Sequence, residues 1–238
     1  RVSAFMAGGV ATAILGSVTA MALIVVGLAA AGAINTALGL AVLLGADVGS
    51  AVVTQVLLFR QDFLIPLLLV VGVVLFKSAE STRLRPIGRI LIGLALLFVS
   101  LDMIRSAAEP LMDSPATVSV MQYLGTDMVT AFIIGALIAW LAHSSVAAVL
   151  LMVTLVGQGL LPSTGAMAMV LGANLGGAFI AFVLTLSSPV AARQMVLANL
   201  VLRGGGAAIA LVILVKSGLG LDWLGTTPAQ QTINLHLV

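Results

Sequence analysis

The sequence predicts an all-α integral membrane protein built from two related halves. Its composition is the first observation, since 61% of the 238 residues are hydrophobic and only 8% are charged. A water-soluble domain cannot bury that much apolar surface. The second observation is the length of the apolar segments, which exceeds the roughly 20 residues that cross a bilayer as a helix. Strand-like alternation is absent, so a helical bundle is favoured over an outer-membrane barrel.

The remaining composition limits the chemistry and the topology. There are no cysteines, which excludes disulfides and thiolate metal sites, and the net charge of +2 gives no indication of nucleic-acid binding. Basic residues gather between positions 77 and 89, which predicts a cytoplasmic loop by the positive-inside tendency. The polar stretch 109–127 carries three acids and no base, so we expect it on the opposite side.

A shift of 127 residues aligns the first half of the chain with the second. Identical small residues coincide at fixed spacing. In a chain this apolar, matches between apolar residues are common by chance, whereas matches of glycine and serine are not. "LGADVGSA" (44–51) also meets "LGANLGGA" (171–178). We interpret this as an internal duplication. The matched pairs include Gly8 with Gly135, Ser17 with Ser144, and Gly32 with Gly159.

Two apolar segments have polar centres, "LGSVT" (15–19) within 4–32 and "AHSSV" (142–146) within 128–157. Each arm is too short to cross a bilayer at 1.5 Å per residue, so both segments are predicted to be re-entrant helical hairpins. Three crossings, at 36–59, 63–76 and 87–108, lie between the equivalent points of the two copies. An odd number inverts the second copy, and an inverted repeat is typical of secondary transporters.

The glycines and polar residues in "LLGADVGSA" (43–51) and "VLGANLGGA" (170–178) predict a break in two transmembrane helices, at 45–50 and 172–177. Unpaired backbone at membrane depth is tolerated only where it is buried or lines a cavity. A restarted helix presents free N–H groups that attract anions, and free carbonyls attract cations. Two related breaks would therefore form one midplane site.

These motifs resemble the type II sodium-dependent phosphate cotransporters and their bacterial relatives, over nearly the whole chain. That family has a Gln-Ser-Ser-Ser hairpin tip followed by a Gly-Ala-Asn-Ile-Gly-Thr-Thr break. "AHSSVAAVLLMVTLVGQGLLPSTGAMAMVLGANLGGA" is similar to its second copy, and "ILGSVTAMALIVVGLAAAGAINTALGLAVLLGADVGSA" to its first. Both family glutamines are replaced, by Gly16 and His143, and Asp47 replaces the first asparagine. The resemblance implies sodium-coupled phosphate symport, a further helix before Arg1 and more chain after Val238.

The candidate site residues follow from the tips and the predicted breaks. The serines could be small packing residues, but equivalent positions in both copies favour a binding role. Asp47 could bind sodium, carry a proton or pair with Arg203, because a carboxylate at membrane depth is functional by default. The predicted substrate-binding residues are Gly16, Ser17, His143, Ser144 and Ser145. The predicted cation-binding residues are Thr19, Asp47, Ser50 and Asn174, with sodium at Asp47 and Asn174.

We therefore predict an inverted-repeat transporter with two re-entrant hairpins and two broken transmembrane helices, multi-pass in the cell membrane and not an enzyme. Its expected partners are inorganic phosphate or a related anion, sodium as coupling ion and the lipid bilayer, with a homodimer left open and no other cofactor. The alternatives are a divergent transporter or exporter of another anion or solute, coupled to protons or another ion, and a membrane scaffold subunit without transport. The predicted regions are 1–76 (first repeat: hairpin 4–32, broken helix 36–59), 77–127 (basic cytoplasmic loop, linking helix, external loop), 128–216 (second repeat: hairpin 128–157, broken helix 164–187) and 217–238 (start of a further element).

Overall fold

The computed structural model describes residues 1–58, 63–78, 84–111, 113–217 and 224–237, which are helical apart from turns. The predicted all-α class is confirmed for these residues. The helices are α1 (Val2–Leu15), α2 (Val18–Ala30), α3 (Thr36–Leu58), α4 (Leu64–Ser78), α5 (Leu84–Ala108), α6 (Pro115–Thr126), α7 (Met128–Leu141), α8 (Ser145–Gly157), α9 (Ser163–Leu184), α10 (Val190–Ser217) and α11 (Pro228–Asn234), with 3-10 turns η1 (Glu109–Leu111) and η3 (Leu235–Leu237).

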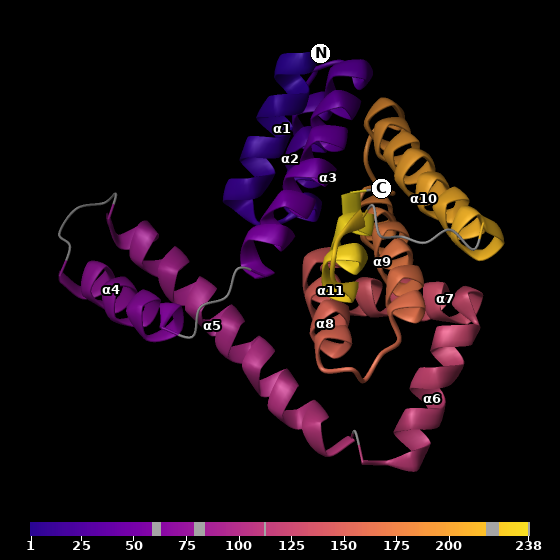
Figure 1. Cartoon of the computed structure of the whole chain (residues 1–238). Coiled ribbons are helices and arrows are strands. Elements are labelled where there is room, and N and C mark those ends of the chain that lie inside the picture. Colours follow the sequence, from indigo (N-terminus) through magenta and orange to yellow (C-terminus); the bar gives the residue numbers. More distant parts are fainter. Residues whose placement is uncertain (59–62, 79–83, 112, 218–223, 238) are drawn as a thin grey trace.

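Each segment predicted to be a hairpin forms two helices joined by a short turn, and a long helix follows each pair. Helices α1 and α2 lead into α3, and α7 and α8 lead into α9 (Figure 1). The turns also match at the offset of 127 residues. Gly16 and His143, at the two tips, have φ of 65° and 51°, and Gly32 and Gly159, after the hairpins, have φ of 73° and 74°. The two units therefore have the same local backbone path.

Glycine allows the first arm of each hairpin to lie directly against the long helix of its unit. A Cβ added to Gly45 of α3 would come within 1.9 Å of the Phe5 carbonyl oxygen of α1. The equivalent Gly172 of α9 has the same 1.9 Å approach to the Phe132 carbonyl oxygen of α7. Further pairs repeat this contact in both units: Gly8 with Val42 and Gly135 with Met169, and Gly49 with Gly9 and Gly176 with Ala136.

The prediction of broken helices at 45–50 and 172–177 is wrong. Helices α3 and α9 run without interruption through both segments. The glycines there serve close helix packing instead, because small residues let two membrane helices approach until their backbones touch. The interruptions in the helical backbone occur at the hairpin tips.

Among the residues that the structure describes, four helices are long and apolar enough to cross a membrane, or five if the bent pair α6 and α7 counts as one span. The four are Thr36–Leu57, Leu84–Ile104, Ser163–Leu184 and Val190–Lys216. The predicted crossing at 63–76 is not among them, because α4 has 15 residues and would be about 22 Å long at 1.5 Å per residue. The stretch 109–127, predicted to be a loop, contains α6, which meets α7 at a bend of 107°. The basic loop is described only at its edges, because residues 79–83 lie outside the described residues.

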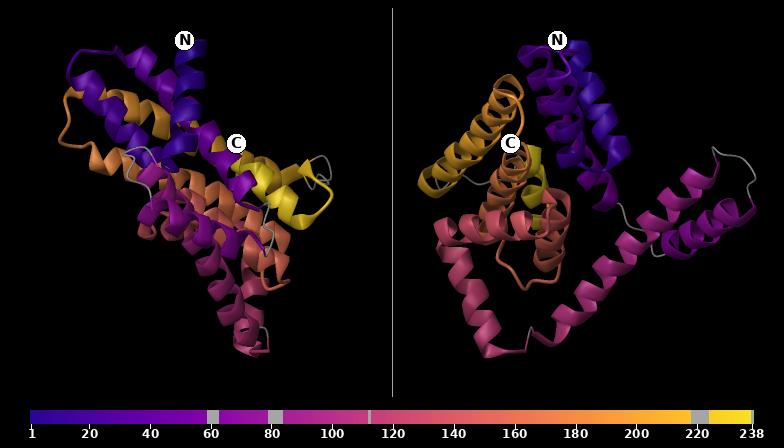
Figure 2. Two further views of the ribbon diagram at one scale, coloured as in Figure 1. Left: turned by 90° about the vertical axis from the view of Figure 1, so that its left-hand side faces the viewer. Right: turned by 180° about the vertical axis from the view of Figure 1, so that it is seen from behind.

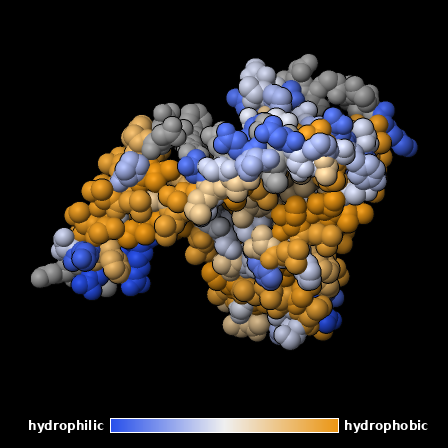
Figure 3. All heavy atoms as spheres, turned by 90° about the horizontal axis from the view of Figure 1, so that it is seen from below, coloured by the Kyte–Doolittle hydropathy of each residue, from blue (hydrophilic) through white to orange (hydrophobic). Residues whose placement is uncertain are grey.

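The hairpin of α4 and α5 projects away from the body formed by the two units (Figures 1 and 2). Gly88 of α5 brings the two helices together, because a Cβ there would come within 2.7 Å of the Gly72 oxygen. Apolar side chains dominate both the arm and the body in Figure 3, and hydrophilic residues gather at their margins. Such broad apolar surfaces are what a lipid environment requires.

The C-terminal segment fills the space between the two units. Helix α11 and turn η3 pack against α3, α8 and α9, and lie between the units in Figure 1. Gln55 Nε2 of α3 donates to Asn234 Oδ1 at 2.9 Å, which ties the segment to the first unit. Of the stretch 217–238, predicted to begin a further element, α11 and η3 thus form part of the core between the halves.

We expect Gly172→Ala to lower the free energy of unfolding by about 1–3 kcal/mol, because the added methyl group overlaps the Phe132 carbonyl. Gly27→Ala in α2 is the control, since nothing lies within 4 Å of its added Cβ. There the higher helix propensity of alanine should leave stability unchanged or slightly raised. Thermal unfolding in detergent would measure both, and equal effects would contradict the packing role of Gly172.

Candidate functional site

The two hairpin tips are built in the same way. Ser17 caps α2, with its Oγ accepting from the Ala20 amide at 3.2 Å, and Ser144 caps α8 by accepting from the Ala147 amide at 3.1 Å. A capping serine satisfies one amide of the first turn and keeps its own hydroxyl proton for another acceptor. The other amides of each first turn have no partner within the helix. Each tip is thus a cluster of hydrogen-bond donors.

His143 is held in a backbone conformation that histidine rarely adopts. Its φ of 51° lies in the left-handed region, where it is the only such non-glycine residue among those that the structure describes. The equivalent position in the first tip is Gly16, which adopts φ of 65° without strain. His143 is exposed, and its Nδ1 lies 3.2 Å from the Leu141 carbonyl oxygen. An exposed, strained side chain at a tip is consistent with a site role.

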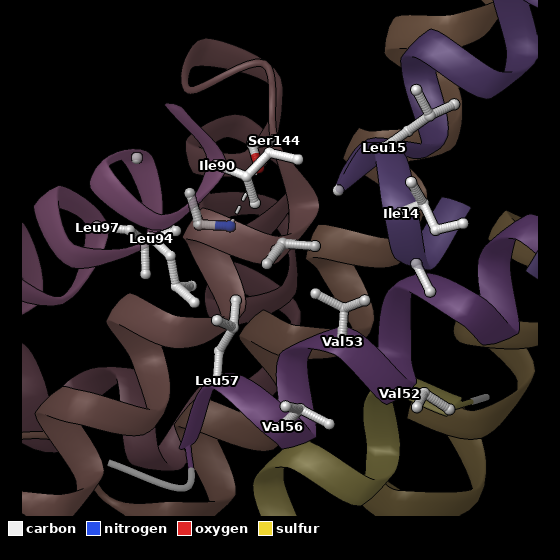
Figure 4. A pocket seen from close by; sticks show the side chains of 15 residues that line it. Ile14, Leu15, Val52, Val53, Val56, Leu57, Ile90, Leu94, Leu97 and Ser144 are labelled. Atoms are coloured by element: carbon white, nitrogen blue, oxygen red, sulfur yellow. Dashed lines mark hydrogen bonds between the residues drawn. The ribbon is translucent and has the colours of Figure 1, made fainter. Parts of the chain in front are cut away.

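The two tips meet at one cavity of about 650 Å³. Gly16 from the first tip and Ser144 from the second both line it, and Figure 4 shows Ser144 at its edge with a dashed bond to the amide of Ala147. The remaining lining residues are apolar and come from α1, α3, α5 and α8. The structure therefore brings residues of both predicted tips to a shared space with low-polarity walls.

The other predicted tip and cation residues occupy separate positions. Ser145 is buried against α9, where a Cβ added to Gly177 would lie 3.2 Å from its Oγ. Thr19 lies in the first turn of α2 and is not among the residues that line the cavity between the tips. Ser50 is buried on α3, and its Oγ has no hydrogen-bond partner.

Asp47 and Asn174, the equivalent polar residues of the two long helices, meet at a buried polar cluster. Arg203 of α10 joins them, with its Nη1 paired to Asp47 Oδ1 and its Nη2 donating to Asn174 Oδ1 at 3.1 Å. The side chain of Arg203 is 5% exposed and that of Asp47 is 13% exposed. The pairing of Asp47 with Arg203, one of the three roles considered for Asp47, is thus present in this conformation.

His236 completes this cluster, and the sequence reasoning did not identify it. Its Nδ1 lies 2.6 Å from Asn174 Oδ1, and its carbonyl oxygen accepts from Asn174 Nδ2 at 3.5 Å. The available sequence signal was a titratable residue inside the apolar run "INLHLV" (233–238). Its partner is 62 positions away, so only the fold brings them together.

The fold and the two tips define a class, an α-helical multi-pass membrane protein made of two equivalent hairpin-and-helix units. The sequence profile of the Na+/Pi-cotransporter family matches residues 1–106 and 112–225, so the chain belongs to this family. The predicted family is therefore confirmed. The family is one of transport proteins, in agreement with the expectation that the chain is not an enzyme.

Several curated bacterial proteins are similar over nearly the whole chain. The "Putative inorganic phosphate export protein YjbB" of Escherichia coli (strain K12) is 32% identical over 98% of this chain, and the protein of that name from Salmonella typhimurium is equally similar. The chain spans 43% of the length of these relatives. The "Uncharacterized protein YqeW" of Bacillus subtilis is 28% identical over 99% of this chain and 76% of its own length. No solved structure matches.

We expect Arg203→Met to lower the free energy of unfolding by about 3–5 kcal/mol, because it leaves the Asp47 carboxylate buried without its ion-pair partner. Arg193→Met is the matched control on the same helix, where the guanidinium makes one exposed bond, 3.5 Å long, to the Leu186 carbonyl oxygen. Its effect should stay within about 0.5 kcal/mol. Denaturant unfolding in micelles would compare them, and a similar loss in both would argue against a structural ion pair at Arg203.

Proposed function

We propose that this chain forms the transport core of a phosphate transporter, with inorganic phosphate held between the two hairpin tips. The observation that carries the proposal is the shared cavity, because Gly16 and Ser144 reach it from equivalent tips of the two units. The family description and the names of the YjbB relatives both specify phosphate, which supports this choice of anion.

The tips offer what a phosphate ion requires. Helices α2 and α8 both begin there, and a helix N-terminus attracts an anion through its free amides and its dipole. The hydroxyls of Ser17 and Ser144 and the imidazole of His143 would add donors from side chains, whereas Ser145 is buried against α9. Apolar walls strengthen these bonds, because charge–dipole attraction is larger where water is excluded.

The duplication suggests how phosphate would cross the membrane. The proposed arrangement is an inverted repeat in a bacterial inner or plasma membrane, with the two hairpins on opposite sides of a midplane site. Alternating access would then follow from movement of the units against the projecting α4–α5 arm. The equivalent tips and their shared cavity support this arrangement. The inversion requires an odd number of crossings between the two units, and α4 has only 15 residues, so the test is a measurement of which side of the membrane each loop faces.

Two directions of transport are candidates. The family description favours sodium-coupled uptake, in which sodium would bind near Asp47 and Asn174 with help from Thr19 and Ser50. The name of the YjbB relatives favours phosphate export instead. In the present conformation Arg203 contacts both Asp47 and Asn174, so sodium binding there would require Arg203 to move.

The test is the movement of radiolabelled phosphate in proteoliposomes that contain the full-length protein. We expect Ser144→Ala to reduce the rate at least about tenfold, because it removes a donor from the tip. Ser144→Thr keeps the hydroxyl and the helix cap, so it should retain most of the rate. Ser119→Ala on α6 is a control for serine loss at an exposed site.

Uptake that depends on an inward sodium gradient would support the symporter, and sodium-independent efflux from loaded vesicles would support the exporter. Transport of another solute but not of phosphate would contradict the choice of cargo. Absence of any transport and of any ligand-induced thermal shift in a well-inserted protein would instead favour a membrane scaffold subunit.

His143→Gly should separate the fold from the function. Removal of the side chain relieves the left-handed strain, so the free energy of unfolding should rise by about 1 kcal/mol. Phosphate transport should nevertheless fall, because the imidazole donor is lost from the tip. Thermal unfolding and vesicle transport would be measured on the same preparation. A stable variant with the wild-type transport rate would remove His143 from the predicted site.

A further inference from the structure

Arg203 joins the two side chains that are predicted to hold sodium. Its Nη1 pairs with Asp47 Oδ1 of α3, and its Nη2 donates to Asn174 Oδ1 of α9 at 3.1 Å. Asp47 and Asn174 are equivalent positions of the two repeats, so one guanidinium connects both units at the same level. A cation of the protein itself therefore contacts both groups that the sequence assigns to a metal ion.

The backbone of the long helices offers no ligand that could replace these side chains. The sequence predicts free carbonyl groups at breaks in α3 and α9, but both helices continue through 45–50 and 172–177. A carbonyl group inside an uninterrupted helix accepts from the amide four residues later. The carbonyl group of Ser50 also accepts from Thr54 Oγ1 at 2.9 Å. A sodium ion at this level would therefore depend on the side-chain oxygens of Asp47 and Asn174.

Those side-chain oxygens are already engaged. Besides Arg203 Nη2, His236 Nδ1 lies 2.6 Å from Asn174 Oδ1. Asn199 of α10 hydrogen-bonds the Asp47 carboxylate, which also pairs with Arg203. Sodium binding would have to displace these nitrogen groups, so the arrangement does not fit a sodium ion while Arg203 is in place.

The charges at this position are already matched. Helices α1, α2, α7, α8 and α11, which pack against α3 or α9, contain no acidic or basic residue. Asp47 is the only charged residue of α3, and α9 has none. Asp47, Arg203 and His236 share a cavity of about 280 Å³ whose other walls are apolar. A sodium ion there would be a second cation for one carboxylate, in a space where like charges repel strongly.

Close packing of α10 holds Arg203 at this position. A Cβ added to the next residue, Gly204, would come within 2.6 Å of Leu175 Cδ1 of α9. About two turns earlier, Met195 fills the space that a Cβ on Gly39 of α3 would need. Helix α10 thus contacts the long helices of both units, and the Arg203 side chain extends from it to both of them.

We propose that Arg203 replaces the coupling sodium ion of the predicted site, and that phosphate transport by this chain does not depend on sodium. The planar guanidinium suits this role, because its fork of donors can contact two oxygens at once. It is covalently part of α10, so it supplies the positive charge between the repeats and cannot leave with the cargo. A sodium gradient then has no ion to move through this site. This inference rests on the proposed transport of phosphate.

The first experiment needs no phosphate. It measures the thermal midpoint of the full-length protein in nanodiscs, in sodium, potassium and choline chloride of equal ionic strength. The wild type should give the same midpoint in all three salts, because Arg203 keeps both oxygens engaged. In Arg203→Ala, sodium should raise the midpoint by at least about 2 °C relative to choline, because the released carboxylate can bind the ion.

Three further variants separate the charge of Arg203 from other effects. Arg203→Lys keeps the positive charge and should stay insensitive to sodium. Arg193→Ala removes the other arginine of α10, which makes one exposed bond, and should respond like the wild type. The double variant Asp47→Asn/Arg203→Ala lacks the carboxylate and should lose the response to sodium. If Arg203→Ala does not fold, the midpoints of the wild type and Arg203→Lys still test the proposal.

The second experiment measures the movement of radiolabelled phosphate in proteoliposomes, with sodium or choline chloride on both sides of the membrane. The wild-type rate should differ by less than about twofold between the two salts, because no coupling energy links sodium to phosphate. Asp47→Asn is measured in parallel, so that any effect of sodium can be assigned to this site or to another.

Each outcome has a separate meaning. A response of the wild-type midpoint or transport rate to sodium, lost in Asp47→Asn, would overturn the inference and assign a metal ion to Asp47. A response kept in Asp47→Asn would also overturn it, because sodium would act elsewhere. Equal midpoints of folded Arg203→Ala in all salts would show that Arg203 covers no cation site. Absence of phosphate transport in either salt, with the expected midpoints, would overturn the proposed function and not the role of Arg203.

Discussion

The contact between the backbones of each hairpin and its long helix is the constraint on which the other features depend. At Gly45 and Gly172 the opposing carbonyl oxygen leaves no space for even a methyl group. Lipid tails are as apolar as these side chains, so burial of apolar surface does not drive helices together in a bilayer. The helices associate through close van der Waals packing instead. Three equivalent glycine positions in each unit make such packing possible, and they set which turn of α1 faces α3 and which turn of α7 faces α9.

That register decides where the chemistry lies. With α1 held against α3, the first tip ends beside Val52 and Val53 of α3, at the cavity that Ser144 reaches from the second unit. With both long helices unbroken, Asp47 and Asn174 occupy equivalent levels, close enough for one guanidinium to contact both. The two polar features are therefore separate, one made of helix N-termini at the tips and the other of side chains at the core.

The C-terminal segment completes the core cluster through His236. Arg203 makes one contact to the side-chain oxygen of Asn174. His236 makes a second contact to the same oxygen, and it comes from turn η3, which lies outside both repeats. The same turn places His236 at the wall of one cavity together with Asp47 and Arg203.

The sequence by itself determined that the fold lies in a membrane, and it determined the helices, the duplication, the helical hairpins and the family. These features follow from composition and from repeated small residues, which are visible within short stretches of the chain. It also predicted Gly16 and Ser144, because a turn needs glycine and a helix start needs a capping oxygen. Only the tertiary structure decided whether the glycines at 45–50 and 172–177 interrupt a helix or pack it. A glycine permits both outcomes, and what stands opposite, here Phe5 and Phe132, selects one. The pairing of Arg203 and the arrival of His236 were likewise decided by contacts between distant segments, for which local patterns carry no information.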